Sequence, residues 1–425
     1  MPVEVFDHIL GLTCGTYLNH YGLYTESRTL NAHFVHQRGC LRAVSRDWRK
    51  AVNNKSFLWN AWCGSTRGRI ETFNECTSRF GPGPVDLRLE FKPGPARPGK
   101  VSTPALLELV NKVTEQCATL KLFMMDDIDT ANIISTVHSN RFPLLSNLSI
   151  TVLYWGGPNY DGTAPETPCP ATFAHFPNSL KDLRLDGHPV PWTTPESFSL
   201  LTTLVINRLG RLDSPNVGEF EALLKAAPNL ERLSLNCVAA PGIGASRHSI
   251  TMSKLHTIHY CPVGHRDLGS LISRVDAPNL THLELGMWNM ADFEILEMCR
   301  KTFRIATHLT IGGFKFTTEA LKTIYELLPL ATDVDLTAAS LFLRRMADAS
   351  LPMWPKLVQL RIEEPALGEL NKLVDRIAIE RLKVYCPGEA FTPKSIMTNI
   401  MNSIPTVVVN TQREPKWHST VFVSE

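Results

Sequence analysis

Hydrophobic residues recur along most of the chain in the order leucine-x-x-leucine-x-leucine, with conservative replacements at some positions. The copies that begin at positions 230, 255, 280, 306, 331 and 357 are spaced by 25 or 26 residues, which is too regular for chance. Two earlier copies lack the first leucine and retain Leu87-Leu89 and Leu120-Leu122. The pattern therefore predicts an array of similar structural units. The fuller copies are Leu145-Leu148-Ile150, Leu180-Leu183-Leu185, Leu201-Leu204-Ile206, Leu230-Leu233-Leu235, Leu255-Ile258-Tyr260, Leu280-Leu283-Leu285, Ala306-Leu309-Ile311, Ala331-Val334-Leu336, Leu357-Leu360-Ile362 and Ile379-Leu382-Val384.

Each copy predicts a short strand, because its second and third apolar positions are two residues apart and point to the same side. One strand and one helix of this size cannot bury their apolar faces alone, so the units must stack. Stacking predicts an α/β fold with parallel strands on the inside of a curve and helices outside. Segments with helical periodicity lie between the copies, at 102–116, 129–140, 216–230, 265–275, 291–304, 317–331 and 366–376.

The spacing and order of these leucines resemble those of leucine-rich-repeat proteins. The resemblance implies a curved leucine-rich-repeat solenoid over residues 101–409. Residues 63–100 are interpreted as a connector and a first irregular repeat, and residues 410–425 as a polar tail.

Residues 1–62 lack the repeat and carry a different pattern. In the stretch LRAVSRDWRKAV, at 41–52, Leu41, Val44 and Trp48 recur at intervals of three and four residues, and basic residues fill the other sides. This spacing predicts an amphipathic helix with one apolar stripe. A helix this short is unstable in isolation, so its stripe must pack against its own protein or a partner.

Three segments of this region, PVEVFDHIL, LRAVSRDWRKAV and SFLWNAW, resemble an F-box in that order. The resemblance implies a three-helix unit at residues 1–62 that binds the Skp adaptor of SCF ubiquitin ligases and, through it, cullin. Pro2 and Val44 are 42 positions apart, which is longer than the family's pattern, so residues 13–38 are interpreted as an insertion. The resemblance implies an adaptor-binding surface made of Pro2, Val5, Ile9, Leu10, Leu41, Val44 and Trp48.

Composition agrees with a globular protein and excludes several classes. The chain has 425 residues, 44% of them hydrophobic, and a formal net charge of +2, which gives no overall attraction to nucleic acid or membrane. Its ten cysteines are at least thirteen residues apart, which excludes a CxxC motif and is typical of free thiols in a reducing compartment. The N-terminus lacks the charge and apolar run of a signal peptide, and no segment has the apolar length of a membrane span. We expect a cytoplasmic or nuclear protein.

Motifs that would indicate catalysis are absent: GxSxG, a P-loop and HExxH do not occur. His282 and His308 occupy the same position in adjacent repeats, where sheet spacing brings them within about 5 Å. They are interpreted either as zinc ligands or as polar residues of a binding face, and the lack of a third ligand at a fixed spacing favours the second reading. We expect no enzymatic activity, metal or cofactor. A basic run at 37–70 permits nucleic-acid binding, but without interleaved aromatic residues a solvated or adaptor-binding surface is favoured.

The polar residues that alternate with the leucines form columns on the inner face of the predicted solenoid. In the C-terminal third, an acidic rung formed by Asp333 and Asp335 lies beside basic ones. We expect a protein substrate to bind there. The residues assigned to this surface are His282, His308, Asp333, Asp335, Arg361 and Lys383.

Two functions agree with these patterns. The first is a substrate receptor of an SCF-type ubiquitin ligase, in which the F-box binds the Skp adaptor and the repeats hold a protein substrate. The second is a leucine-rich-repeat interaction scaffold with a degenerate F-box and no role in a ligase.

Overall fold

The chain forms two compact units in this computed structural model, and each is described by itself. Unit 1 comprises Met1–Leu201 and unit 2 comprises Thr202–Glu425. The structure describes residues 40, 42–46, 48–50, 59–66, 68–92, 98–125, 130–153, 177–187, 198–207, 217–236, 249–261, 274–286, 300–312, 318–337, 354–363, 370, 372–373, 379–385, 400 and 403–410.

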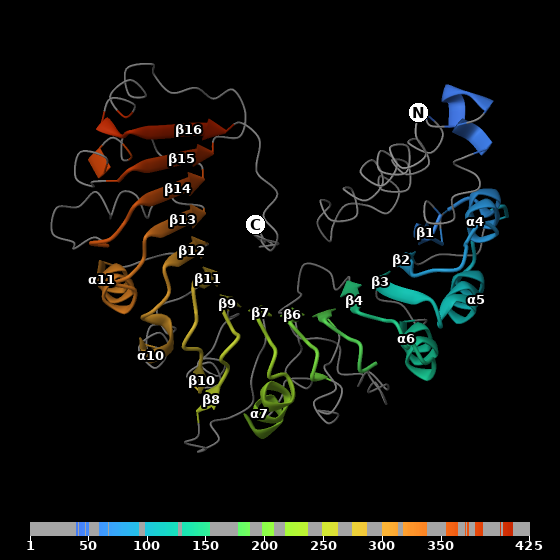
Figure 1. Ribbon diagram of the computed structural model, residues 1–425, viewed down its shortest axis with the longest axis horizontal. Helices are drawn as coiled ribbons and strands as arrows, with labels where there is room; N and C mark the ends of the chain where they lie inside the picture. Colours follow the sequence, from blue (N-terminus) through green and yellow to red (C-terminus); the bar gives the residue numbers. More distant parts are fainter. Residues whose placement is uncertain are drawn as a thin grey trace, which may run out of the picture. The chain divides into compact units, whose positions relative to one another are not determined.

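Unit 1 contains a parallel sheet with strand order β1-β2-β3-β4-β5. Helices α4, α5 and α6 lie along one side of this sheet (Figure 1). Short helical pieces are also present at residues 40, 42–44, 46 and 48–50. The elements in chain order are β1 (Ala61–Ser65), α4 (Ile70–Thr77), β2 (Val85–Phe91), α5 (Thr103–Val113), β3 (Cys117–Met125), α6 (Thr130–Ser139), β4 (Asn147–Leu153) and β5 (Asp182–Asp186).

Unit 2 also alternates strands and helices along the chain. Its main sheet is parallel, with strand order β6-β7-β9-β11-β12-β13-β14-β15-β16, and β8 and β10 form a separate parallel pair. Helices α7, α10 and α11 lie on one side of its main sheet (Figure 1). The elements in chain order are β6 (Thr203–Asn207), α7 (Val217–Ala226), β7 (Arg232–Asn236), β8 (Ile250–Thr251), β9 (Thr257–Cys261), β10 (Val275–Asp276), β11 (His282–Gly286), α10 (Arg300–Phe303), β12 (His308–Gly312), α11 (Thr318–Leu327), β13 (Asp333–Thr337), β14 (Gln359–Glu363), β15 (Arg381–Tyr385) and β16 (Thr406–Asn410).

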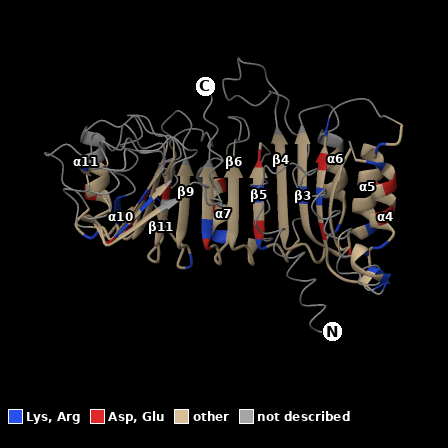
Figure 2. Cartoon of the chain, turned by 90° about the horizontal axis from the view of Figure 1, so that it is seen from above, with Lys and Arg blue, Asp and Glu red and all other residues tan. Residues whose placement is uncertain are grey.

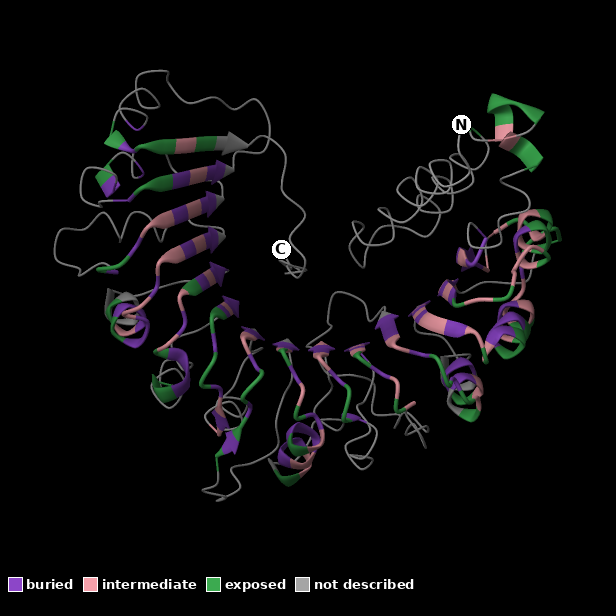
Figure 3. Cartoon of the chain, in the orientation of Figure 1, coloured by how far each residue is buried: buried purple, intermediate pink, exposed green. Residues whose placement is uncertain are grey.

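The leucine pattern explains how these layers hold together. In β11, Leu283 and Leu285 are each buried, whereas His282 between the turn and Leu283 is exposed. The same alternation holds in β12, where Leu309 and Ile311 are buried. Figure 3 shows buried residues concentrated in the strands and on the helix sides next to them. The prediction of an α/β fold with a repetitive parallel sheet is therefore confirmed.

A recurrent turn precedes the strands and sets their register. The amide of the first apolar residue of a repeat donates to the carbonyl three residues earlier, as from Leu230 to Ala227 and from Leu280 to Ala277. Proline occupies the second position of both turns, Pro228 and Pro278, where its fixed φ suits a type I turn. Because each strand begins from the same turn, equivalent residues of successive strands are paired.

Three elements differ from the expected pattern. Strand β1 has no leucine and begins inside the range 1–62, and it pairs with β2. At Gly64 of this strand, an added Cβ would overlap the ring of Trp62. Helix α4 begins at Ile70, and the N-cap residue before it, Arg69, makes no side-chain capping hydrogen bond, so the usual start signal is missing. Val275–Asp276 forms strand β10 rather than the end of the helix expected at 265–275, because it pairs with Ile250–Thr251 of β8.

None of the helices in the described part of the chain has the length and apolar character needed to cross a lipid bilayer.

Each unit has one sheet side on which no helix of the described residues lies, called here its open face. The residues that alternate with the buried apolar positions lie on this face. Figure 2 colours the acidic and basic positions, which are distributed along the strands of both units.

Candidate functional site

Only part of the expected adaptor-binding surface falls in the described chain. Pro2, Val5, Ile9, Leu10, Leu41 and the range 13–38 lie outside the described residues. Val44 and Trp48 are described, and both are on the helical pieces at 42–50. Val44 is 62% exposed, which is unusual for a large apolar side chain in the structure, and Trp48 is half-buried.

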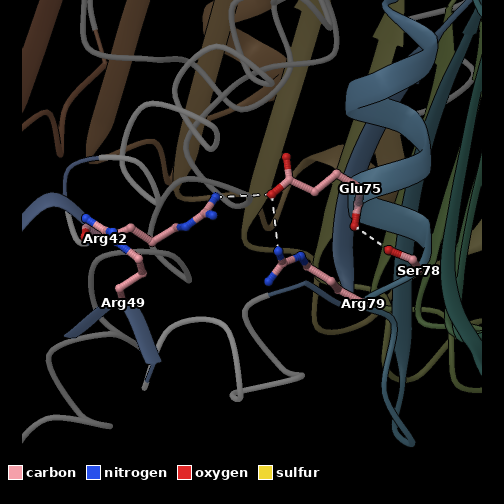
Figure 4. A network of polar contacts seen from close by, with 5 residues as sticks. All are labelled: Arg42, Arg49, Glu75, Ser78 and Arg79. Atoms are coloured by element: carbon pink, nitrogen blue, oxygen red, sulfur yellow. Dashed lines mark hydrogen bonds and ion pairs between the residues drawn. The ribbon is translucent and has the colours of Figure 1, made fainter. Parts of the chain in front are cut away.

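A polar network connects this helical stretch to the first repeat (Figure 4). Arg42 Nη1 lies 3.1 Å from Glu75 Oε1 of helix α4, and Arg79 Nη2 lies 3.4 Å from the same oxygen. Arg49 Nε donates to the carbonyl of Arg42 at 3.2 Å, and Ser78 Oγ donates to the carbonyl of Glu75 at 3.0 Å. The basic side of the stretch is therefore joined to helix α4 through Arg42.

Val44 points away from this network because of helical spacing. It is two positions from Arg42, which corresponds to roughly 200° around a helix. The helix is interrupted at Ser45, whose Oγ accepts from the amide of Trp48 at 3.2 Å, so Trp48 lies on a second helical piece, where it is half-buried. The ion pair of Arg42 with Glu75 thus leaves Val44 exposed on the other side of the first piece.

The six residues expected to bind a partner all lie on the open face of unit 2, and the sheet brings them together in two rows. His282, His308 and Asp333 are paired in register on β11, β12 and β13. The second row joins Asp335, Arg361 and Lys383 on β13, β14 and β15. The equal length of the repeats is what aligns residues that are about 25 positions apart in the chain.

The histidines of the first row are in direct contact. Their rings are stacked, with centroids 4.3 Å apart and an interplanar angle of 17°. His308 Nε2 lies 3.5 Å from Asp333 Oδ2, and Thr332 Oγ1 donates to that oxygen at 2.7 Å. Burial, followed by the neighbouring His308, lowers the pKa of the His282 imidazole below its usual range. The row therefore favours a neutral His282 beside a carboxylate.

The second row combines opposite charges. Arg361 Nε lies 3.7 Å from Asp335 Oδ2, and both side chains are about one-fifth exposed, at 19% and 20%. Lys383 is half-buried on the next strand and has no ion pair among the described residues. A partner that approaches this row meets a neutralised pair followed by an available ammonium group.

A second polar cluster on the same face involves residues that the sequence placed in the columns but did not single out. Ser234 Oγ lies 3.2 Å from His259 Nδ1, and His259 Nε2 lies 3.8 Å from Glu284 Oε1. The order hydroxyl, imidazole, carboxylate is that of serine hydrolases. Ser234 is only 2% exposed, however, so a substrate carbonyl has no access to its oxygen, and burial lowers the pKa of His259. The cluster satisfies buried polar groups of the sheet.

The described residues contain no group of three or more histidine, cysteine, aspartate or glutamate side chains placed to hold a metal ion. The stacked pair of His282 and His308 provides two ring nitrogens and one adjacent carboxylate, Asp333, in a row rather than around a point. The chemistry that the open face of unit 2 offers is hydrogen bonding and charge pairing with a ligand laid across the strands.

Comparisons with known proteins give little information. No family model matches the chain, and no curated protein matches it. Among solved structures, the chain is similar to a structural-genomics protein from Bacteroides fragilis, at 14% identity and a TM-score of 0.29, over 55% of this chain and 66% of that one. A similarity at this level supports no statement about function.

Proposed function

We propose that the protein is a non-enzymatic substrate receptor of an SCF-type ubiquitin ligase. Residues 1–62 would bind the Skp adaptor, which connects to cullin, and the open face of unit 2 would hold a protein substrate. The protein would promote ubiquitin transfer by raising the local concentration of a substrate near the conjugating enzyme, without a chemical step of its own.

The observation that carries the proposal is the exposure of Val44 beside the anchored Arg42. The basic side of the same stretch is held to α4 by Arg42, and an exposed valine is left facing outward. Exposed apolar residues next to a half-buried aromatic are typical of protein contact sites. The F-box resemblance of the surrounding sequence supplies the identity of the partner.

Co-purification with the Skp adaptor tests the first half of the proposal. We expect the full chain to bind the adaptor and both Val44→Asp and Trp48→Ala to weaken binding by about tenfold or more, since anchor residues contribute about 1.4 kcal/mol or more. Lys50→Ala is the matched control, because Lys50 is exposed on the same helical stretch. A folded wild-type chain that does not bind the adaptor would favour the scaffold function instead.

The second half concerns the substrate and has its own test. Replacing Asp333 and Asp335 by lysine reverses the charge of the acidic rung without touching the core. We expect the set of proteins retained by the full chain, measured by quantitative mass spectrometry under proteasome inhibition, to change. Glu326→Lys on helix α11, away from the open face, is the control with the same change of charge. An unchanged set in the double variant would refute the assignment of this rung.

A further inference from the structure

A row of basic residues crosses the open face of unit 1 at mid-strand. Arg88 of β2 is in register with Lys121 of β3, Lys121 with Ser149 of β4, and Ser149 with Arg184 of β5. Adjacent strands are about 4.8 Å apart, so these four side chains share a strip of roughly 15 Å. Sequence counting does not reveal the row, because the repeats here differ in length.

Lys121 is the centre of positive charge in this row, and the nearby carboxylate of Asp182 offsets its charge only in part. Among the described residues it donates no hydrogen bond and makes no ion pair, although it is only half-exposed to solvent. Burial, followed by repulsion from Arg184 and Arg88, lowers the pKa of its ammonium group. A half-buried cation without a directly bonded counter-ion is costly, and a bound anion would reduce that cost.

Ser149 creates a gap between two long basic side chains. It is 5% exposed, and its hydroxyl makes no hydrogen bond within the described part of the chain. On the far side, Arg184 donates from Nε and Nη2 to the two carboxylate oxygens of Asp182 at 2.9 Å each. That pairing leaves Nη1 without a hydrogen bond to any described residue. Lys121, Ser149 and Arg184 therefore place three donors side by side on three consecutive strands.

Acidic residues limit what this row can accept. Two positions along the same strands, Asp86 and Asp182 lie on one side of the row, and Glu90 and Asp186 lie on the other. Figure 2 shows this alternation of acidic and basic positions along β5. The acidic positions are roughly 6.6 Å from the basic row. A polyanion such as a nucleic acid would extend along the face and meet several of these carboxylates. A single dianion at the row would lie beside the carboxylate of Asp182 alone, whose charge Arg184 already pairs.

We propose that Lys121, Ser149 and Arg184 bind the phosphate group of a phosphorylated side chain on a protein partner. Three donors from three strands match the three terminal oxygens of a phosphomonoester. No described helix covers this row, so further contacts come from the chain that carries the phosphate, and the acidic positions favour basic residues near it. This inference concerns unit 1 alone and goes beyond the proposed ligase role, because it uses neither the N-terminal stretch nor the face of unit 2.

Binding by the full chain is tested with three probes at matched ionic strength, by isothermal titration calorimetry. The probes are a synthetic peptide Gly-Lys-Gly-phosphoserine-Gly-Lys-Gly, its unphosphorylated form, and inorganic phosphate. We expect saturable binding of the phosphopeptide, at least about tenfold tighter than of either other probe, because charge-assisted hydrogen bonds are stronger than neutral ones. Equal binding of the two peptides would overturn the proposal, and equal binding of inorganic phosphate would overturn the protein-borne source.

Variants locate the site on the sheet. Lys121→Met should reduce phosphopeptide affinity by about tenfold or more, and Lys121→Arg, which keeps the charge, should retain most of it. Lys112→Met on α5 of the same unit is the control, because Lys112 is exposed on the helical side. Circular dichroism and a thermal melt verify folding, and Lys121→Met should be no less stable, since its charge is unpaired. Unchanged affinity in a folded Lys121→Met variant would overturn the site, and tighter binding of a ten-nucleotide single strand would overturn the occupant.

Discussion

Replacing Leu309 by alanine tests the alternation on which the whole architecture depends. Leu309 lies in the middle of β12, is 2% exposed and is in register with Leu283 on one side and Val334 on the other. The next residue, Thr310, belongs to the same strand but points to the open face and is half-buried. The two substitutions therefore change neighbouring residues of one strand in opposite environments.

The expected magnitude follows from the carbon atoms removed. Leucine to alanine deletes about three methylene equivalents, each contributing about 0.8 kcal/mol when buried, which gives about 2.4 kcal/mol. The residual cavity between two packed neighbouring strands adds to this, so we expect a loss of about 3 kcal/mol, within the range of about 2–5 kcal/mol for buried leucines. Thr310→Ala removes a half-exposed β-branched side chain and should cost less than about 1 kcal/mol.

Urea unfolding followed by circular dichroism measures both free energies of unfolding, with the comparison valid where the slope is unchanged. The expected order is wild type, then Thr310→Ala close to it, then Leu309→Ala clearly lower. Equal losses in the two variants, or a loss below about 1 kcal/mol in Leu309→Ala, would show that the strand does not bury this side as described.

Three further predictions concern other residues. The folded-state pKa of His282 lies below its unfolded value of about 6.5. Its contribution to stability is therefore present above about pH 6.5, and it is lost as the pH falls from about 6.5 to the folded-state pKa. In thermal melts at a series of pH values, His282→Gln should make stability depend less on pH over this interval. Burial raises the pKa of the Cys117 thiol to about 12, so at pH 8 a maleimide reagent should label the exposed Cys40 rapidly and Cys117 only upon unfolding, as mass spectrometry of proteolytic fragments will show. Gly64→Ala should lower the melting temperature, because the added Cβ overlaps the ring of Trp62; an unchanged melting temperature would contradict that packing.

The strands of the repeats could be predicted from the sequence because two separate signals coincide there. The apolar positions alternate with a period of two, and each copy begins a fixed distance after the last, as with Leu283 and Leu309. The turn with a proline at its second position, as at Pro228 and Pro278, is a third signal that sequence reasoning overlooked. Strand β1 and helix α4 could not be found in this way, since one has no leucine and the other has no capping side chain.

The candidate surfaces also contain some contacts that counting along the sequence could predict and others that it could not. His282 and His308 could be paired by counting, because a step of 26 residues separates equivalent positions, and the structure stacks their rings. The register of Lys121 with Ser149 could not be extended by counting to Arg184, because the step from the copy at Leu145 to that at Leu180 is 35 residues. Likewise, no local pattern indicates that Arg42 binds Glu75, which is 33 positions away.

The sequence by itself determined which residues become strands and which of their sides is apolar, because periodicity and turn chemistry act over a few neighbouring residues. Tertiary structure decided which polar residues meet. Burial around Lys121, the ion pair of Arg42 with Glu75 and the outward exposure of Val44 depend on distances between segments that are far apart in the chain. Such distances are set only when the repeats stack, since stacking fixes both the neighbours of a charge and its access to water.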